Sequence, residues 1–301
     1  MLADALAEIE KSGAEILRSE PLSRHTSFRI GGAVTAMIFP RSTKQLAGIT
    51  RIIRERGAPS LVLGRGTNIL ADDRPHELIA VSTAKIAEEL AFVGGGTVHA
   101  SCGAPLSRVA AYAAEHGLGG LEFAQGIPGS LGGAVYMNAG AYGGELSAAV
   151  GSVRAVTPGG ETRELSAAEC RFAYRSSLFA DGGYTILSAD IKLAAADRDE
   201  IAMRMRDFAR RRRESQPLEQ ASAGSAFKRP KDGYAAALID GCGLRGFRVG
   251  DAMVSEKHAG FVVNAGAATF ADVIAVINHV RETVLREKGV ALEPEVMIID
   301  S

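Results

Sequence analysis

The chain has 301 residues, of which 47% are hydrophobic, and carries a formal net charge of −1 at pH 7. A chain of this length and composition can bury a large core and divide into two or three domains. The net charge is near zero, and the sequence has no basic stripe interleaved with aromatic residues. It therefore lacks the charge pattern of a nucleic-acid-binding protein.

Cysteine and histidine usage restricts the compartment and the cofactor. The three cysteines, Cys102, Cys170 and Cys242, are widely spaced and form no C-x-x-C motif, which fits a reducing cytoplasm and favours neither a disulfide framework nor a zinc site. The six histidines show no metal-binding spacing, so we expect an organic cofactor and no protein-held metal. Without a signal-peptide pattern or an apolar run of membrane-spanning length, we expect no membrane insertion.

The first elements alternate between helix and strand. Residues Ser42 to Arg56 predict a helix, because Ser42 with Gln45 has the pattern of a capping box, apolar residues recur on one face and a glycine follows. A strand is predicted over Leu61 to Leu63. A second helix is predicted over Leu106 to His116, again followed by a glycine.

A glycine-rich loop, Gly64 to Asn68, follows the first predicted strand. Strand ends are where ligands collect in α/β folds. Ile69 stands where the dinucleotide-binding fingerprint has its third glycine, and no Walker-type lysine follows, so we exclude a Rossmann or P-loop site. The loop supplies Arg65 for charge together with hydroxyl and amide donors.

The segment from Gly126 to Glu145 is the second glycine-rich part of the chain. It contains seven glycines and the polar residues Ser130, Asn138 and Tyr142. Glycine lets consecutive backbone amides point toward one anionic oxygen without Cβ clashes. Tight turns in a β-rich core would have the same composition. With the earlier loop, however, the segment predicts a diphosphate cradle, which makes a dinucleotide cofactor the leading hypothesis.

Extended patterns dominate from Ala149 to Leu193. Strands are predicted over Val153 to Val156, Glu161 to Leu165 and Thr185 to Leu193, and Thr157 to Gly160 predicts a hairpin turn between the first two. This part of the chain is therefore α+β in character.

Arg175 lies between aromatic and hydroxyl residues, in the stretch from Phe172 to Ser177. A planar guanidinium suits a carboxylate or an enolate. On the residues alone, an arginine whose stem covers a domain surface is the more common explanation.

The last hundred residues have the pattern of a separate domain. A long helix is predicted from Asp199 to Glu214, and its basic run, Arg210 to Arg213, is interpreted as a solvated helix end that complements the dipole. Gln216-Pro217 marks a boundary. A capped helix is predicted over Thr269 to Lys288, and a terminal strand over Val290 to Ile299.

This region contains two candidate groups of chemical residues. Ser225 precedes Lys228 by three residues, but the surrounding stretch is not G-x-S-x-G, so a turn serine is the default interpretation and a hydrolase elbow is not supported. Glu293 and Glu295 flank Pro294, and in a strand they would alternate faces, so at most one is expected to point into a cleft. Surface carboxylates are the default.

Taken together and in order, these segments resemble the UDP-N-acetylmuramate dehydrogenase (MurB) family of flavoprotein reductases, in its shorter subtype. The resemblance covers nearly the whole chain. It rests on Thr26–Gly32, Gly64–Leu70, Gly126–Glu145, Tyr174–Ser177, Ala223–Lys228 and Leu292–Val296.

The resemblance implies an α+β fold with FAD as cofactor. Residues 1–200 would form an FAD-binding region of the vanillyl-alcohol-oxidase/PCMH type, with a core over about 24–190 whose two subdomains divide near 72–85, and residues 201–301 would form the substrate-binding domain. NADPH would reduce FAD, leave and be replaced by UDP-N-acetylglucosamine enolpyruvate. No nucleic-acid partner is implied, and a monomer is compatible with the sequence.

The resemblance also implies residue roles. Hydride transfer from flavin N5 to C3 of the enolpyruvyl group leaves negative charge at C2; Arg175 would face that charge, Ser225 would donate the proton, and Glu295 would act as a carboxylic acid with a raised pKa near the substrate carboxylate. The implied FAD-binding residues are Gly64, Arg65, Gly66, Thr67, Asn68, Ile127, Pro128, Gly129, Ser130, Gly132 and Gly133. The implied substrate-binding residues are Tyr142, Tyr174, Lys228, Lys257 and His258.

Four departures from the family pattern are visible. Thr67 stands where a serine is more usual, and Gln220-Ala221 replaces an aromatic-proline pair, which loosens a turn before Ser225. Met297 and Asp300 stand where arginine and glycine are more usual, which changes the local charge near the implied carboxylic acid. No departure removes a catalytic residue.

Two alternatives stay open on the sequence. Another flavoprotein of the same fold would share the glycine-rich loops, but has no reason to carry the motifs of Arg175, Ser225 and Glu295. A non-enzymatic nucleotide-binding module would explain the loops without needing a proton donor and a carboxylate in a second domain.

Overall fold

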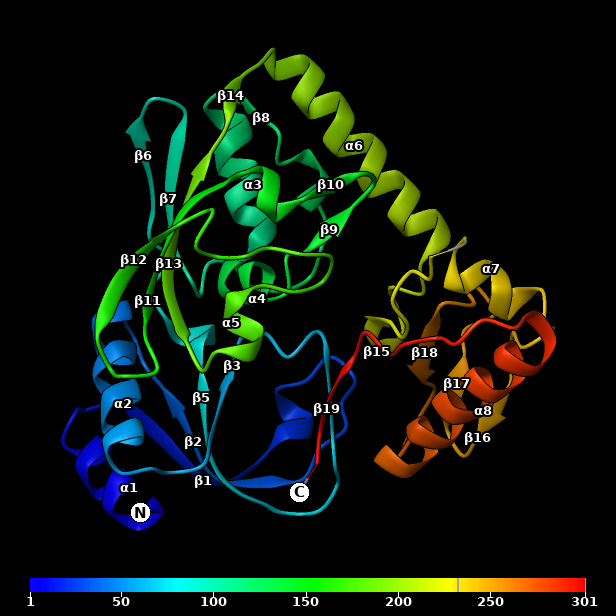
Figure 1. Cartoon of the computed structure of the whole chain (residues 1–301), viewed down its shortest axis with the longest axis horizontal. Helices are drawn as coiled ribbons and strands as arrows, with labels where there is room; N and C mark the ends of the chain where they lie inside the picture. The colour runs from blue at the N-terminus through cyan, green and yellow to red at the C-terminus, as the bar shows by residue number, and fades with distance from the viewer. Residues whose placement is uncertain (232, 301) are drawn as a thin grey trace. The chain divides into compact units, whose positions relative to one another are not determined.

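The structure is a computed structural model that describes residues 1–231 and 233–300. It divides the chain into two units, whose elements are traced by colour in Figure 1. The first unit comprises Met1–Arg18, Thr35–Arg65 and Leu78–Arg211, and the second comprises Ser19–Val34, Gly66–Glu77 and Arg212–Ser301. Across the described ranges, no helix is both long enough and apolar enough to cross a membrane.

The first unit is built around an antiparallel sheet with strand order β12-β11-β13-β7-β6. Helices α2 and α4 pack on β13, and α3 and α4 pack on β7. Its helices are α1 (Leu2–Glu10), α2 (Thr43–Glu55), α3 (Leu106–Glu115), α4 (Leu131–Tyr136), α5 (Leu178–Asp181) and most of α6 (Arg198–Ser215). Its further strands are β3 (Ser60–Leu63), β6 (Leu90–Gly94), β7 (Thr97–Ser101), β8 (Leu118–Gly119), β9 (Gly140–Ala141), β10 (Gly144–Glu145), β11 (Val150–Val156), β12 (Thr162–Ser166), β13 (Thr185–Lys192) and β14 (Ala194–Ala195).

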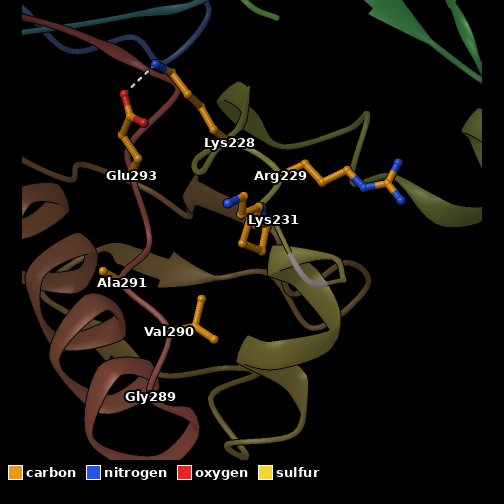
Figure 2. Close-up of a pocket in the computed structure, with 8 residues that line it drawn as sticks. Lys228, Arg229, Lys231, Gly289, Val290, Ala291 and Glu293 are labelled. Carbon is orange, nitrogen blue, oxygen red and sulfur yellow. Dashed lines mark hydrogen bonds and ion pairs between the residues drawn. The ribbon is translucent and has the colours of Figure 1, made fainter.

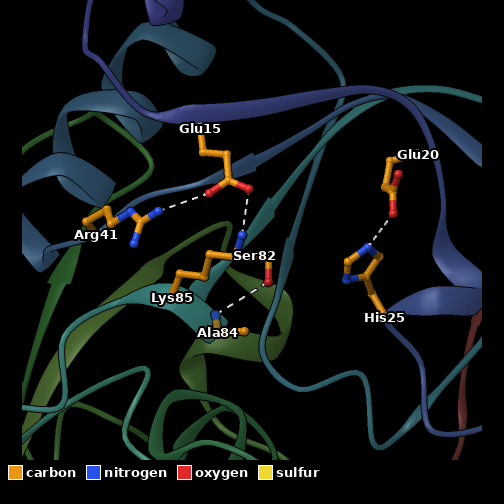
Figure 3. A network of polar contacts seen from close by, with 7 residues as sticks. All are labelled: Glu15, Glu20, His25, Arg41, Ser82, Ala84 and Lys85. Carbon is orange, nitrogen blue, oxygen red and sulfur yellow. Dashed lines mark hydrogen bonds and ion pairs between the residues drawn. The ribbon is translucent and has the colours of Figure 1, made fainter.

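A second sheet has the order β1-β2-β5-β3, from β1 (Glu15–Pro21), β2 (Ala33–Phe39), β5 (His76–Ser82) and β3, with β3 and β5 parallel. Glu15 joins its first strand to two neighbouring segments, because its carboxylate accepts hydrogen bonds from Lys85 (2.6 Å) and Arg41 (3.1 Å) (Figure 3). The hydrogen bond from Lys85 is the main cause that lowers the pKa of Glu15.

The second unit contains an antiparallel sheet with the order β15-β18-β17-β16, and helix α8 packs on β16, β17 and β18. A parallel pair, β19 with β4, completes it. The elements are β4 (Ile69–Ala71), β15 (Ala221–Ser225), α7 (Ala235–Asp240), β16 (Arg248–Val249), β17 (Ala252–Val254), β18 (Phe261–Asn264), α8 (Phe270–Lys288) and β19 (Met297–Ile299).

The division differs from the predicted one, in which residues 1–200 form one region. Phe28, Ile30 and Leu70 are at most 2% exposed and belong to the same hydrophobic cluster as Val276 and Val280 of α8. Burial of apolar side chains is the main driving force of folding. It therefore brings two N-terminal segments into the C-terminal unit. The later boundary falls after Arg211, near the end of α6, rather than after residue 200 in its first turn.

Most predicted elements are confirmed. Helix α2 begins after Ser42, whose Oγ accepts the N–H of Gln45, although the Gln45 side chain accepts from the N–H of Arg41 rather than from that of Ser42. Strands β11 and β12 form the predicted hairpin, in which the N–H of Thr157 donates to Glu161. The long helix is α6.

The predicted terminal strand is wrong over most of its length, since strand β19 begins only at Met297. Pro294 has no N–H to contribute to a ladder. Its neighbours instead bond to one short segment, because the Glu293 carbonyl accepts from the N–H of Lys228 (2.9 Å) and the Glu295 N–H donates to the carbonyl of Ala226 (2.9 Å).

The basic run at the end of α6 is only partly solvated. Arg210 and Arg211 each pair with Asp207 at 2.7 Å. Arg212 is buried, with 7% of its surface exposed, which the expectation of a solvated helix end did not foresee.

Helix α8 starts with a complete capping box. Thr269 Oγ1 accepts the N–H of Asp272 (3.1 Å), and the Asp272 carboxylate accepts the N–H of Thr269 (2.9 Å). We predict that Thr269→Ala lowers the free energy of unfolding by about 1 kcal/mol, because the helix loses its side-chain cap. Thr269→Ser keeps the hydroxyl and is the matched control. Urea denaturation followed by circular dichroism measures both, and equal stability of the two variants would contradict the prediction.

Candidate active site

The first glycine-rich loop, Gly64–Asn68, follows strand β3, as predicted, and leads into β4. Gly66 has φ +61°, and a Cβ at this position would lie 2.0 Å from the carbonyl oxygen of His25. The N–H of Ser27 donates to the carbonyl of Gly66 (3.0 Å). Backbone therefore packs directly on backbone here, which leaves room for glycine alone.

The second glycine-rich segment, Gly126–Glu145, meets the first loop within the first unit. A Cβ at Gly64 would lie 2.7 Å from Oγ of Ser130, the residue that caps α4 and accepts the N–H of Gly133 (3.4 Å). The two stretches thus come together, although more than sixty residues separate them in the chain.

The start of α4 is fixed on a neighbouring segment. The N–H of Gly132 donates to the carbonyl of Cys102 (2.9 Å), and a Cβ at Gly132 would lie 2.9 Å from the Cβ of Cys102. Burial raises the pKa of the Cys102 thiol to about 12, so this sulfur stays a neutral packing atom at physiological pH. Gly133 differs, because it is exposed and a Cβ there would meet Ser130 Oγ at an ordinary 3.6 Å.

Tyr142 lies at the tip of the hairpin that β9 and β10 form. Tyr142 and Gly143 both have positive φ, +52° and +86°, which matches a two-residue type I′ turn. The Tyr142 ring stacks on Phe208 of α6, with centroids 4.7 Å apart, and is 37% exposed. Its ring is therefore stacked on α6, while part of the residue remains accessible.

Arg175 lies in a tight turn. Ala173 and Ser176 exchange both backbone hydrogen bonds, at 3.0 and 3.1 Å, and Arg175 between them has φ +53°. A left-handed conformation costs a non-glycine residue about 1–2 kcal/mol. The guanidinium donates to the carbonyl of Gly140 (2.9 Å) and lies over the ring of Tyr174, which is 48% exposed.

Asn138 holds this turn against the second glycine-rich segment. It is fully buried, and its amide donates to the carbonyl of Ala173 (3.0 Å) and accepts the N–H of Ser147 (2.9 Å). Like Arg175, it has a positive φ, of +46°. Asn138 therefore fixes the turn that carries Arg175, and both residues have an unusual backbone conformation.

Ser225 ends strand β15 in the second unit. Its partner across the ladder is Phe261, and the N–H of Ala226 donates to the carbonyl of Gly260 (2.8 Å). The same Ala226 accepts the N–H of Glu295, so Ser225 and Glu295 come from directly bonded segments. Both side chains are half-buried.

The turn before β15 closes in spite of its departure from the family pattern. The N–H of Gln220 donates to the carbonyl of Pro217 (3.1 Å), and Ala221 pairs with Asn264. Of the other departures, the backbone N–H of Met297 donates to the carbonyl of Asn68 (3.0 Å), a bond that does not involve the Met297 side chain. Asp300 is exposed.

Lys228 borders a pocket of about 410 Å³ in the second unit. Its amino group pairs with the carboxylate of Glu293, while Arg229 extends away from that pair (Figure 2). The lining residues are Lys228, Arg229, Pro230, Lys231, Gly289, Val290, Ala291 and Glu293. Three cationic side chains and one carboxylate give the pocket a net positive charge. No motif in the sequence indicated that Arg229 and Lys231 would line such a pocket.

Lys257 and His258 lie in one turn, where Ser255 Oγ accepts both of their N–H groups, at 3.2 and 3.3 Å. The Lys257 amino group donates to the carbonyl of Arg213 (2.8 Å). The Nδ1 of His258 accepts the N–H of Gly260 (3.2 Å), and burial lowers the pKa of His258, so its neutral form is favoured. Both side chains thus bond to backbone.

Two family models match the chain. One describes a FAD binding domain and matches residues 34–166, and the other describes the C-terminal domain of UDP-N-acetylenolpyruvoylglucosamine reductase and matches residues 216–299. The reductase of Syntrophomonas wolfei is 42% identical over 281 residues, which cover 93% of the chain and 94% of the relative. The chain belongs to the UDP-N-acetylenolpyruvoylglucosamine reductase family.

Further relatives agree. The reductase of Caldicellulosiruptor bescii is 42% identical over 293 residues, with 97% of the chain and 93% of the relative covered. The crystal structure of the Thermus caldophilus reductase (MurB) has a TM-score of 0.79 at 32% identity, covering 95% of the chain and 98% of that structure. Alkyldihydroxyacetonephosphate synthase, at a TM-score of 0.51 and 16% identity, shares the fold alone over 65% of this chain and 41% of its own.

The predicted family and the predicted α+β fold with an FAD-binding domain are therefore confirmed, and the chain is a FAD-dependent oxidoreductase. The residues of the first unit fit this cofactor. Gly64 and Gly133 add no side chain where the two glycine-rich stretches meet, and Ser130 adds a hydroxyl. Backbone amides and hydroxyls are suitable donors for a diphosphate. Within the described ranges, no group of three or more metal-ligating side chains converges.

Two adjacent glycines, Gly132 and Gly133, allow the effect on packing to be separated from the effect on FAD binding. We predict that Gly132→Ala destabilises the FAD-free protein by about 1–3 kcal/mol, because its Cβ meets Cys102, whereas Gly133→Ala leaves stability unchanged or raises it by up to about 1 kcal/mol. Gly133→Ala should nevertheless weaken FAD binding, because its Cβ enters space left open beside the loop. Thermal unfolding and flavin fluorescence titration measure the two effects. Wild-type FAD affinity in Gly133→Ala would contradict the cradle.

Proposed function

We propose that this flavoenzyme reduces UDP-N-acetylglucosamine enolpyruvate to UDP-N-acetylmuramate, with NADPH as the electron source, in cytoplasmic synthesis of peptidoglycan precursors. The relatives named UDP-N-acetylenolpyruvoylglucosamine reductase support it, since they match the chain over nearly its whole length. The structural observation that carries the proposal is the direct bonding of the Ser225 segment to the Glu295 segment, through the N–H of Glu295 and the carbonyl of Ala226.

For the cofactor, we assign the first glycine-rich loop and residues Ile127 to Gly133 to the diphosphate and ribityl chain of FAD. Bound FAD would supply the hydride that adds to C3 of the enolpyruvyl group. The contribution of this chain is binding and orientation. The close approach of Gly64 to Ser130 supports the assignment, because it removes side chains from the surface that a flexible diphosphate has to follow.

Ser225 would donate the proton to the substrate. Hydride addition at C3 leaves an electron pair and negative charge at C2, and the Oγ–H of Ser225 transfers its proton there as the new C–H bond forms. A serine hydroxyl is a weak acid, but the carbanionic C2 is a strong enough base to take its proton. The ladder partner Phe261 and the bond from Ala226 to Gly260 support a fixed position for this hydroxyl.

Arg175 and Glu295 would stabilise the charge that develops next to C2. A guanidinium can contact an enolate-like carboxylate at two points, and a protonated Glu295 can donate a hydrogen bond to the same group. The left-handed backbone of Arg175 supports a functional role, because residues kept in costly conformations cluster at active sites.

The remaining assignments concern the nucleotide and sugar of the substrate. We propose that Lys228 and the positive pocket beside it attract the substrate diphosphate, and that the exposed rings of Tyr142 and Tyr174 contact the sugar or the base. Lys257 and His258 are further candidates for contacts with the nucleotide and sugar, since Gly260 of their turn bonds to Ala226 beside Ser225.

The test separates the two half-reactions. The FAD-loaded protein is reduced with NADPH without oxygen, which bleaches the flavin absorbance, and UDP-N-acetylglucosamine enolpyruvate is then added. Rapid return of the oxidised spectrum supports the proposal. A flavin that bleaches but ignores this substrate would point to a different acceptor and would contradict it.

Variants assign the proton donor. We predict that Ser225→Ala slows the return of the oxidised spectrum by about 10²–10⁴-fold, because general acid catalysis at C2 is lost, while bleaching by NADPH is unchanged. Ser222→Ala removes a hydroxyl from the same strand and is the matched control. Stopped-flow absorbance measures both phases, and a Ser225→Ala variant with wild-type reoxidation would exclude Ser225 as the donor.

A further inference from the structure

Ser27 contacts two functional segments at once. It belongs to the Thr26–Gly32 motif, for which the sequence indicated no role. Its N–H donates to the carbonyl of Gly66 (3.0 Å), and its Oγ donates to the carbonyl of Ser222 (2.6 Å) and lies 3.3 Å from that of Gly66. One residue of the second unit therefore links the first glycine-rich loop to the strand that ends at Ser225.

Strand β15 has an irregularity at the point that Ser27 holds. Ser222 pairs with Val263 and Ser225 with Phe261, so one extra residue is inserted on β15 between the two pairs. Gly224 within this bulge has φ +78°. A bulge disrupts the ladder and re-aims the side chains that follow it. The hydroxyl of Ser27 supplies a hydrogen bond to the carbonyl at the start of the bulge, and Ser225 lies at its end.

The segment that carries Ser27 is itself held firmly. Thr26 Oγ1 donates to the carbonyl of Ile30 (3.0 Å). Phe28 is 2% exposed, and its carbonyl accepts a hydrogen bond from the amide of Asn264 on β18 (3.1 Å). Just before it, His25 pairs with Glu20 at 2.9 Å (Figure 3). The residues on both sides of Ser27 are thus held by hydrogen bonds. One of these bonds comes from β18, the strand that pairs with Ser225.

We propose that Ser27 is a positioning residue for proton transfer from Ser225, acting through the bulge of β15; the kinetic part of this inference rests on the proposed function. Loss of the hydroxyl removes the hydrogen bond at Ser222 and loosens the bulge, so the Oγ of Ser225 no longer stays aligned on C2. The backbone bond from Ser27 to Gly66 survives any side-chain substitution, so FAD binding is separable from proton donation.

The experiment compares Ser27→Ala with Ser27→Thr, which keeps a hydroxyl, and with Ser23→Ala as a control in the same segment. In Ser27→Ala we expect reoxidation by UDP-N-acetylglucosamine enolpyruvate to slow by about 10- to 100-fold, with a larger solvent deuterium isotope effect. The FAD dissociation constant and reduction by NADPH should be unchanged. Ser27→Thr should recover most of the rate, and Ser23→Ala should match the wild type.

Two further readouts make the outcome decisive. On the Ser225→Ala background, Ser27→Ala should add no further loss, because the two residues act as one unit. Amide hydrogen exchange over residues 222–226 should be faster in Ser27→Ala, whatever substrate the enzyme uses. Wild-type exchange and reoxidation in Ser27→Ala would overturn the proposal, as would a parallel loss of FAD affinity and thermal stability. Faster exchange in an enzyme whose wild type ignores the substrate would support the positioning and reject the proposed function instead.

Discussion

The lack of room for a side chain on the first glycine-rich loop is the constraint on which the flavin-binding region depends. A Cβ at Gly64 would lie 2.7 Å from the hydroxyl oxygen of Ser130, and a Cβ at Gly66 would lie 2.0 Å from the carbonyl oxygen of His25. Protein interiors are close-packed, so the contact of Gly66 with backbone is not relieved cheaply. The glycines of these loops therefore have a packing reason as well as a ligand-binding one.

Irregular backbone recurs wherever the chain carries a candidate catalytic residue. Arg175 has a left-handed φ inside a two-residue turn, Ser225 ends a bulged strand, and Glu295 follows Pro294, which interrupts the expected strand. Each irregularity is stabilised by long-range bonds: Asn138 holds the turn of Arg175, and Ser27 holds the bulge before Ser225. Costly conformations persist only when the surrounding structure fixes them in this way. This pattern supports the assignment of all three residues to one reaction.

Local patterns in the sequence predicted the helices, the hairpin and the two glycine-rich stretches, because caps, periodicity and turn residues act over a few positions. The motifs also predicted the family, which the relatives confirm, and the roles of the individual site residues stay predictions. Sequence reasoning missed what depends on distant contacts: the burial of Phe28 and Leu70 in the second unit, the burial of Arg212, and the hydrogen bond from Ser27 to Ser222. Asn138 left one usable signal, since asparagine tolerates the left-handed conformation that glycine otherwise supplies.

The most direct test of the account is a crystal structure of the FAD-loaded protein with UDP-N-acetylglucosamine enolpyruvate bound. We expect C2 of the enolpyruvyl group to lie within about 3.5 Å of Ser225 Oγ, with Arg175 and Glu295 at its carboxylate. A structure in which another acidic group is the nearest donor to C2, or in which FAD does not follow the two glycine-rich stretches, would contradict it.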